Sequence, residues 1–263
     1  MIAAPPTRLT AAQAAAYGSA GLLLFLGVWT LLSLTGAVPR AFLPPPYDVA
    51  ARFIQLFSVP FAGATLPQHL ASSIVRFSYG FLLGALIGIP LGLLMGWYRV
   101  LDEIVSPIFD ALRFIAPIAW VPFAALWFGT GLGGPILIIF AGALPPCLIN
   151  TYRGARFVSR PLIEAAQMLG TGHVRIILEI LLPASTASII AGLRVSAGLG
   201  WQSLIGAELI VASTGVGYMM VQAQLNISTT TVMSAIVAIG LVGFIIDVAL
   251  RSLEAAVRRR GFA

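Results

Sequence analysis

Long apolar runs dominate this chain and limit what it can fold into. Of its 263 residues, 59% are hydrophobic and only 9% are charged, and the mean hydropathy is +0.98. Soluble domains carry about 25% charged residues, so this chain has too little charge to cover a surface that faces water. A spanning helix needs roughly 20 apolar residues, and the chain has about six such runs. We therefore predict an all-α integral membrane protein with about six transmembrane helices.

The apolar runs form one transmembrane domain, residues 18–252, between two tails. The predicted spans are 18–38, 73–97, 104–128, 135–150, 186–211 and 232–250. Prolines at 107, 117 and 122 interrupt the third of these runs. The connections are predicted to hold a surface-lying helix at 47–57, a coupling loop at 153–185 and a polar stretch at 212–231. Residues 1–17 and 253–263 form the tails.

Glycine recurs every four residues in the second predicted span. The glycines are Gly80, Gly84, Gly88, Gly92 and Gly96. This spacing places them on one slowly drifting face of a helix. Small residues on such a face let the backbone of another helix approach closely, so we predict a helix contact there.

Arginine positions predict which span ends face the cytoplasm, because basic residues are enriched in cytoplasmic loops. One set of loops holds ten arginines, and the other holds Arg40 and Arg52, with Arg76 at a span edge. The ten are Arg8, Arg99, Arg153, Arg156, Arg160, Arg175, Arg251, Arg258, Arg259 and Arg260. Both termini and the loop at 153–185 are therefore predicted to be cytoplasmic.

Several chemical functions are excluded by composition. All 15 basic residues are arginine, and a P-loop needs a lysine to reach the phosphates, so any ATP and Mg must bind to another subunit. Cys147 is the single cysteine, and His69 and His173 are too few for a metal centre. We predict no catalytic residue, no cofactor and no metal in this chain. The arginines cluster at the ends of apolar runs, which indicates a membrane rather than nucleic acid as the partner.

A polar stretch, Arg160–Pro183, lies between apolar runs and is predicted to be a structured loop facing water. Pro161 is typical of a helix start, and Glu164 lies near the positive end of that helix. Gly170 is expected to end the helix with a turn. Pro183 is expected to block helix continuation before the fifth span. A loop this structured usually has a partner.

This stretch resembles the EAA loop of the permease subunits of bacterial ABC importers. The pattern is carried by Glu164, Ala165, Ala166, Gly170, Ile180, Leu182 and Pro183, with both of the family's spacings. The resemblance implies a type I ABC importer permease fold. It also implies that these residues form a cytoplasmic coupling helix that docks on an ATPase dimer.

Other residues are similar to those of the nitrate, sulfonate and taurine branch of these permeases. They are Ser73, Arg76 and Gly80, the stretches 89–92, 116–122, 127–129 and 192–194, Trp201, Ala207 and Glu208. This resemblance implies a permease homodimer in the bacterial inner membrane, without ATPase activity of its own. It also implies a periplasmic or lipid-anchored binding protein and a small, often anionic solute such as a sulfonate, taurine or nitrate.

Charges within the predicted spans are candidates for function, because a bilayer makes them costly. Arg194 and Glu208 are 14 residues apart, about 21 Å along a helix and on nearly the same face. One hypothesis places both in the translocation path, with Trp201 between them. The alternative is that each forms a structural ion pair with a neighbouring helix.

Two shorter spacings predict local ion pairs, Asp110 with Arg113 and Asp247 with Arg251. Two other protein classes remain open from the sequence. An ion-coupled secondary transporter would need an acidic or histidine relay deep in the spans, for which Glu208, Asp110 and Asp247 are the candidates. A structural membrane subunit of a redox complex would need no ordered docking loop.

Overall fold

The computed structural model describes residues 10–36, 38–129 and 131–259, and this part of the chain is helical apart from its turns and one isolated bridge, Phe61 to Ala64. Arg8 and Arg260, used above for orientation, lie outside the described residues. The helices are α1 (Ala11–Leu34), α2 (Pro46–Gln55), α3 (Leu66–Trp97), α4 (Arg99–Leu112), η1 (Pro117–Trp120), α5 (Val121–Phe128), α6 (Gly133–Arg156), α7 (Arg160–Met168), α8 (His173–Ile176), η2 (Ile177–Leu181), α9 (Leu182–Val211), α10 (Val216–Leu225) and α11 (Thr229–Arg259). The all-α class is confirmed.

Five of the described helical segments are long and apolar enough to cross a membrane. They are Ala12–Leu34, Leu66–Trp97, Gly133–Arg156, His173–Val211 and Thr229–Val257. The pair formed by α4 and η1–α5 would make a sixth span. The prediction of about six spans therefore agrees with the structure, although most helices extend past the predicted bounds and α1 ends at Leu34, before the predicted residue 38.

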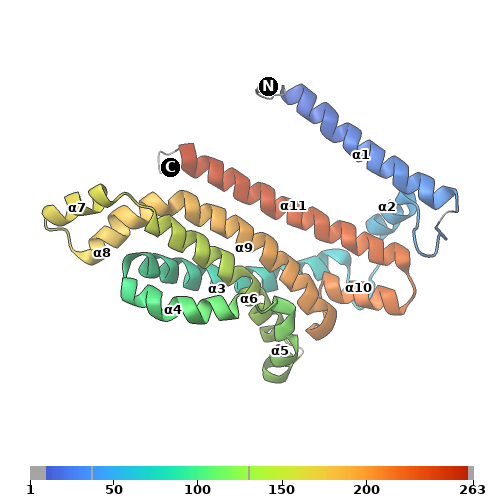
Figure 1. Ribbon diagram of the computed structural model, residues 1–263. Coiled ribbons are helices and arrows are strands. Elements are labelled where there is room, and N and C mark those ends of the chain that lie inside the picture. Colours follow the sequence, from blue (N-terminus) through green and yellow to red (C-terminus); the bar gives the residue numbers. More distant parts are fainter. Residues whose placement is uncertain (1–9, 37, 130, 260–263) are drawn as a thin grey trace.

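The centre of the bundle is α6, which lies between α3 and α9 (Figure 1). The glycine face of α3 rests on α6, as its spacing predicts. A Cβ at Gly84 would lie 3.2 Å from the Ala143 Cβ, and a Cβ at Gly88 would lie 3.2 Å from the Cys147 Cβ. Gly80 and Gly96 face Ile139 and Ala155 in the same way, so matching positions at four-residue spacing meet along the whole contact.

The other side of α6 approaches α9 through glycines on both helices. A Cβ at Gly154 would lie 2.7 Å from the Ser188 Cβ, and a Cβ at Gly192 would lie 2.7 Å from the Asn150 Cβ. In a bilayer, helices associate through van der Waals packing because lipid chains are as apolar as the side chains. Small residues on both sides of α6 therefore hold the three helices together.

The third predicted span, 104–128, is not one straight helix. The segments α4 and η1–α5 meet at a bend of 86°. The bend falls just before Pro117, where Ala116 has an extended backbone (φ −58°, ψ 137°), as expected for a residue before proline. Pro107 lies inside α4 without breaking it.

One expectation about loops is wrong, and one connection holds an element that the sequence did not indicate. The predicted polar connection at 212–231 contains a regular helix, α10. Pro183 does not end the helix before the fifth span, since α8, η2 and α9 form one segment over His173–Val211. The reason is the wide turn η2, a π-helix over Ile177–Leu181 that ends two residues before Pro183. There the proline ring avoids the clash that a regular α-turn would produce.

The two ends of the bundle differ in what they carry. The helices α7 and α8 extend beyond one end, whereas α2 and α10 lie at the other (Figure 1). The helix α1 diverges from the bundle and is held at its C-terminal end. There the Trp29 indole donates a hydrogen bond to the Pro44 carbonyl (3.0 Å), and the Ser33 hydroxyl donates one to the Leu43 carbonyl (2.9 Å).

We predict that Gly92→Ala destabilises the bundle. Its Cβ would lie 2.8 Å from the Leu148 carbonyl oxygen and 3.0 Å from the Tyr152 nitrogen. Backbone atoms cannot rotate away, so the helices must separate, at a cost of about 1–3 kcal/mol. The measurement is the thermal unfolding of the detergent-solubilised protein.

The matched control is Gly27→Ala in α1, where an added Cβ meets no atom within 4 Å. We expect the control to unfold with the wild type. Equal unfolding temperatures for Gly92→Ala and Gly27→Ala would contradict the close-packing argument.

Candidate functional site

The loop helix α7 ends in the way its sequence predicts. Gly170 has φ +75°, in the left-handed region that favours glycine. The Thr171 nitrogen donates a hydrogen bond to the Ala166 carbonyl (3.1 Å), and the Gly170 nitrogen donates one to the Gln167 carbonyl (2.9 Å). These two bonds form a Schellman motif, so the glycine sets the direction in which the chain leaves the helix.

The same helix presents apolar side chains away from the bundle. Met168 and Leu169 are 88% and 85% exposed, and Phe157 just before the helix is 84% exposed. Glu164 and Ala165 are exposed as well. This loop surface therefore combines exposed methyl and aromatic groups with a carboxylate.

The opposite side of α7 is attached to the bundle. Ala166 is buried, and Ile163 packs against a cluster formed by Leu93, Ala155, Leu181 and Ile189. Leu182, at the start of α9, packs against the same cluster. Of the predicted coupling residues, Ile180 lies in the wide turn η2 and Pro183 lies in the first turn of α9.

Arg194 lies in a network of charges between α9 and α11. Its Nε is 2.8 Å from the Asp247 Oδ1, and its Nη1 is 3.6 Å from the Glu254 Oε2. Arg251 contacts the other Asp247 oxygen at 2.8 Å, which confirms the predicted i, i+4 pair. The predicted pair of Arg113 with Asp110 is also formed, at 2.8 Å.

Trp201 is buried on the same face of α9 as Arg194. Its indole nitrogen donates a hydrogen bond to the Ile239 carbonyl of α11 (3.2 Å). Its ring packs edge-on against Phe77 of α3, with the ring centroids 5.6 Å apart. Trp201 therefore joins three helices in this structure.

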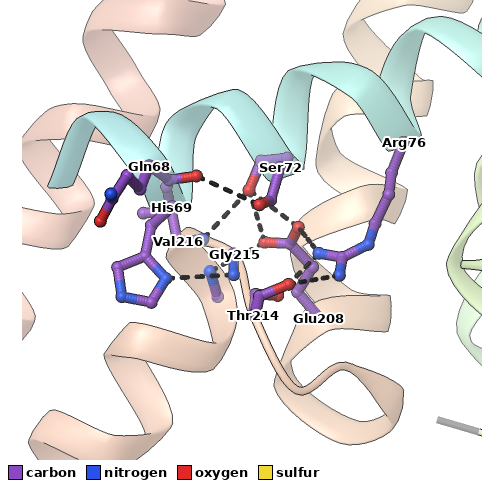
Figure 2. Close-up of polar contacts among 10 residues, drawn as sticks. Gln68, His69, Ser72, Arg76, Glu208, Thr214, Gly215 and Val216 are labelled. Atoms are coloured by element: carbon purple, nitrogen blue, oxygen red, sulfur yellow. Dashed lines mark hydrogen bonds and ion pairs between the residues drawn. The ribbon is translucent and has the colours of Figure 1, made fainter. Parts of the chain in front are cut away.

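Glu208 lies in a buried polar cluster that joins α3, α9 and the turn before α10 (Figure 2). The Arg76 Nη1 is 3.0 Å from the Glu208 Oε1. The Ser73 hydroxyl lies 2.8 and 2.9 Å from the two carboxylate oxygens. The Gly217 nitrogen donates a hydrogen bond to Oε2 at 3.0 Å. The carboxylate is thus compensated on every side by donors and by one positive charge.

Arg76 and His69 attach the turn at 212–215 to α3. The two terminal nitrogens of Arg76 donate hydrogen bonds to the carbonyl and hydroxyl oxygens of Thr214, each at 2.6 Å. The Gly215 nitrogen donates to the His69 Nδ1 (3.2 Å; Figure 2). The His69 Nε2 lies 2.9 Å from the Phe61 carbonyl. These partners require a proton on Nε2 and a lone pair on Nδ1.

The turn fits around the carboxylate because it is built from glycines. Gly215 has φ +115°, and a Cβ there would overlap the Glu208 carboxylate. A Cβ at Gly217 would lie 2.7 Å from the Glu208 Cβ. Any larger residue at either position would push the turn away from α9.

The three predicted path residues, Arg194, Trp201 and Glu208, do share one face of α9, because they are seven residues apart. That face contacts α11 and α3 in this structure. The contacts of Arg194 and Glu208 are those of the alternative hypothesis, ion pairs to neighbouring helices, and Trp201 packs between helices. A role in the translocation path remains a prediction for all three.

The sequence singles out Ser73, Arg76 and Glu208 by family resemblance but does not predict that they contact one another. Arg76 lies at the edge of a predicted span and is nevertheless 3% exposed. His69, weighed in the sequence only as a metal ligand, holds a turn. Among the described residues, no three His, Cys, Asp or Glu side chains gather where they could bind a metal ion. The sequence feature that could have indicated a close turn around Glu208 is the pair of glycines at 215 and 217.

A bundle of membrane-length helices with a short helix held outside one end defines a multi-pass membrane protein with an exposed loop helix. The sequence model of binding-protein-dependent transport system inner membrane components matches residues 88–259. The chain therefore belongs to this family, and it is a permease subunit of an ABC importer.

Relatives and a solved structure agree with this assignment. The chain is 33% identical to the taurine transport system permease protein TauC of Escherichia coli (strain K12) over 234 residues, 89% of this chain and 85% of TauC. It is 33% identical to the bicarbonate transport system permease protein CmpB of Synechococcus elongatus over 236 residues, 87% of this chain and 84% of CmpB.

The fold is that of a solved importer. A chain of the MetNI methionine ABC transporter in an inward-facing conformation matches with a TM-score of 0.64 and 22% identity. The match covers 73% of this chain and 95% of the MetNI chain. The type I ABC importer permease fold is thereby confirmed. In this family a separate ATPase subunit hydrolyses ATP.

We predict that Glu208→Gln strongly destabilises the protein. The substitution keeps the size of the side chain but leaves Arg76 buried without its counter-charge. Removing one partner of a buried ion pair costs about 3–5 kcal/mol. The measurement is thermal unfolding in detergent, with Glu103→Gln as control, since its pair with Arg99 is exposed.

A double-substitution cycle separates charge from shape. Arg76→Gln with Glu208→Gln leaves no unpaired charge, so its effect is expected to be smaller than the sum of the single effects. Strict additivity of the two single substitutions would contradict the ion pair as the source of stability.

Proposed function

We propose that this chain forms the solute path of an ATP-driven importer and is driven by an ABC ATPase dimer that docks on α7 and α8. The observation that carries this proposal is the exposure of Phe157, Met168 and Leu169 at the end of the bundle that carries α7 and α8. Exposed apolar groups beside a carboxylate are typical of a protein interface. ATP and Mg bind to the partner, because this chain has no lysine for a P-loop.

The coupling residues fit a rigid lever. Glu164 and Ala165 face outward for docking, and Ala166 with Ile163 presses on the inner cluster of the bundle. Gly170 sets the turn into α8, and Ile180, Leu182 and Pro183 lie where α8 continues into α9. A displacement of α7 would therefore be transmitted to both α6 and α9 through this cluster.

The mechanism is alternating access. ATP binding draws the two ATPase subunits together and moves the coupling helices, so that the spans open outward. Solute then enters from a periplasmic or lipid-anchored binding protein, and ATP hydrolysis returns the spans to the inward-facing state. The permease acts as a homodimer in the bacterial inner membrane, surrounded by lipid.

The solute is a small anionic compound of the sulfonate, taurine or nitrate type. Support comes from two relatives, which are named for taurine and for bicarbonate transport. Both of those solutes are small and carry an acidic group.

The ion-coupled alternative has no feature in its favour. It would need carboxyl groups that are free to exchange a proton or a cation. Glu208, Asp247 and Asp110 each lie in an ion pair with an arginine. These carboxylates are held by structural partners.

We predict that Leu169→Glu abolishes retention of the partner ATPase. The substitution places a charge at the centre of the proposed apolar contact without disturbing packing, because Leu169 is 85% exposed. A hot-spot loss of about 2 kcal/mol weakens binding roughly 30-fold. The measurement is the amount of ATPase that co-purifies with the tagged permease.

Leu225→Glu is the matched control, since Leu225 is 70% exposed but lies at the end of α10, away from α7. Gly170→Arg is expected to act like Leu169→Glu by straining the turn. Full retention of ATPase by both loop variants, or no retention by the wild type, would refute docking at α7.

Orientation gives a further prediction. Single cysteines at Met168→Cys and Leu225→Cys report the two ends of the bundle, while the native Cys147 is buried. With both termini cytoplasmic, a membrane-impermeant maleimide added to spheroplasts labels the cysteine at 225 at once. The cysteine at 168 is labelled only after permeabilisation, and the reverse order would invert the topology.

A further inference from the structure

A hollow of about 320 Å³ lies on the side of α9 opposite Arg194, Trp201 and Glu208. It is lined by residues of η1, α6 and α9 together with Arg113, just after α4. Its α9 residues, among them Gln202, Ser203 and Gly206, are rotated by more than a quarter turn from the Trp201 face. A volume of this size is in the range of small-molecule sites.

The hollow is near the middle of the bilayer. Gln202 precedes the end of α9 at Val211 by nine residues, which is about 13 Å along the helix. Gly142 follows the start of α6 at Gly133 by nine residues, again about 13 Å. The apolar core of a bilayer is about 30 Å thick, so both walls place the hollow close to halfway.

Arg113 supplies a positive charge to this hollow. Its Nε is used by Asp110 (2.8 Å), and its guanidinium lies over the Phe114 ring, 4.6 Å from the centroid. An arginine has five N–H donors. Four of these N–H donors are on the two terminal nitrogens. They can bind two oxygens of a sulfonate or carboxylate at once, in bidentate geometry.

Two prolines in α6 leave backbone carbonyls beside the hollow without a hydrogen-bond donor. Pro145 and Pro146 line the hollow and have no N–H group. The carbonyls four residues earlier, those of Ala141 and Gly142, therefore lack the usual helical donor, and both residues also line the hollow. These carbonyls can accept hydrogen bonds from an ammonium or hydroxyl group of a solute.

The helix that precedes Arg113 is held to α6 in its first turn, where Asp102 accepts hydrogen bonds from Tyr152 (2.8 Å) and Arg156 (3.0 Å), and is loosely packed toward Arg113. No described residue of α4 is buried. A second hollow of about 190 Å³ lies between α4, η1–α5 and α6, and it shares Arg113, Ile115, Ala141 and Pro145 with the first. Segments with few buried contacts move at low cost, so α4 can carry Arg113 toward the solute or away from it.

We propose that this hollow is the site through which the solute passes, and that it holds a small amino-sulfonate. The sulfonate lies on Arg113, and the ammonium group lies at the Ala141 and Gly142 carbonyls. This inference rests on the proposed importer function and deepens it. It places the solute on the face of α9 opposite the residues first considered for the path.

The first test measures solute taken up per ATP hydrolysed in proteoliposomes that contain the permease, its ATPase and its binding protein. The probes are taurine and ethanesulfonate, which lacks the amino group. Arg113→Gln is expected to lower the uptake ratio at least tenfold, the effect of losing a charge-assisted hydrogen bond, while ATP hydrolysis continues. Arg99→Gln is the matched control, because Arg99 also belongs to α4 and is exposed.

Two further variants sharpen this result. Asp110→Asn is expected to keep or raise the uptake ratio, since it frees Arg113 for the anion. Equal losses in Asp110→Asn and Arg113→Gln would mean that Arg113 serves only its ion pair. A loss in Arg194→Gln with full uptake in Arg113→Gln would overturn the inference and return the path to the opposite face.

The second test requires no transport and no binding protein. Ser203→Cys in the permease–ATPase complex is labelled with an anionic sulfonatoethyl methanethiosulfonate, and the wild type controls for Cys147, which is 1% exposed. Taurine is expected to slow labelling more than ethanesulfonate does. Absence of protection by taurine at tens of millimolar overturns the site.

The solute and the site at Arg113 are tested by different outcomes. A wild type that shows no ATP-dependent uptake of either probe refutes a sulfonate solute, and with it the amino-sulfonate proposed for the hollow. Normal uptake by the wild type together with normal uptake by Arg113→Gln refutes only this site.

Discussion

The contact between α3 and α6 is the interaction on which the rest of the structure depends. Lipid chains solvate apolar side chains as well as other helices do, so packing has to come from close approach. Glycines at four-residue spacing in α3 face Ile139, Ala143 and Cys147 of α6 so closely that a Cβ added to any of them would lie within 3.2 Å of one of these side chains. Because α6 contacts α9 in the same way on its other side, three helices form one unit. The other helices attach to this unit through fewer contacts, as α4 does.

An apolar scaffold of this kind requires its charges to be paired, and the pairs have structural consequences. Arg76 and Glu208 join the turn before α10 to α3 and α9 at one end of the bundle. Arg194 and Asp247 join α9 to α11 farther along the helix. Both pairs lie on the face of α9 that is turned into the bundle. The opposite face of α9 borders the hollow beside Arg113.

Features set by local spacing could be predicted from the sequence, and features set by distant partners could not. The glycine face of α3, the turn at Gly170 and the pair of Asp247 with Arg251 each follow from residues a few positions apart. Glu208 finds Arg76 across 132 positions of the chain, and no sequence period indicates such a partner. The helix over Pro183 was missed for a related reason. A proline predicts a break, but the π-turn before it removes the clash, and that turn has no sequence signature.

The wide turn at Ile177–Leu181 has a consequence for how movement is passed along the fifth span. A π-turn holds one residue more than an α-turn, because its hydrogen bonds close over five positions instead of four. Each residue in a helix accounts for about 100° of rotation. Conversion of this turn to α register would therefore rotate α8 relative to α9 by a little more than a quarter of a revolution, with little change in length. A small displacement of α8 along its axis would then be converted into a rotation of α9, the helix that borders the hollow.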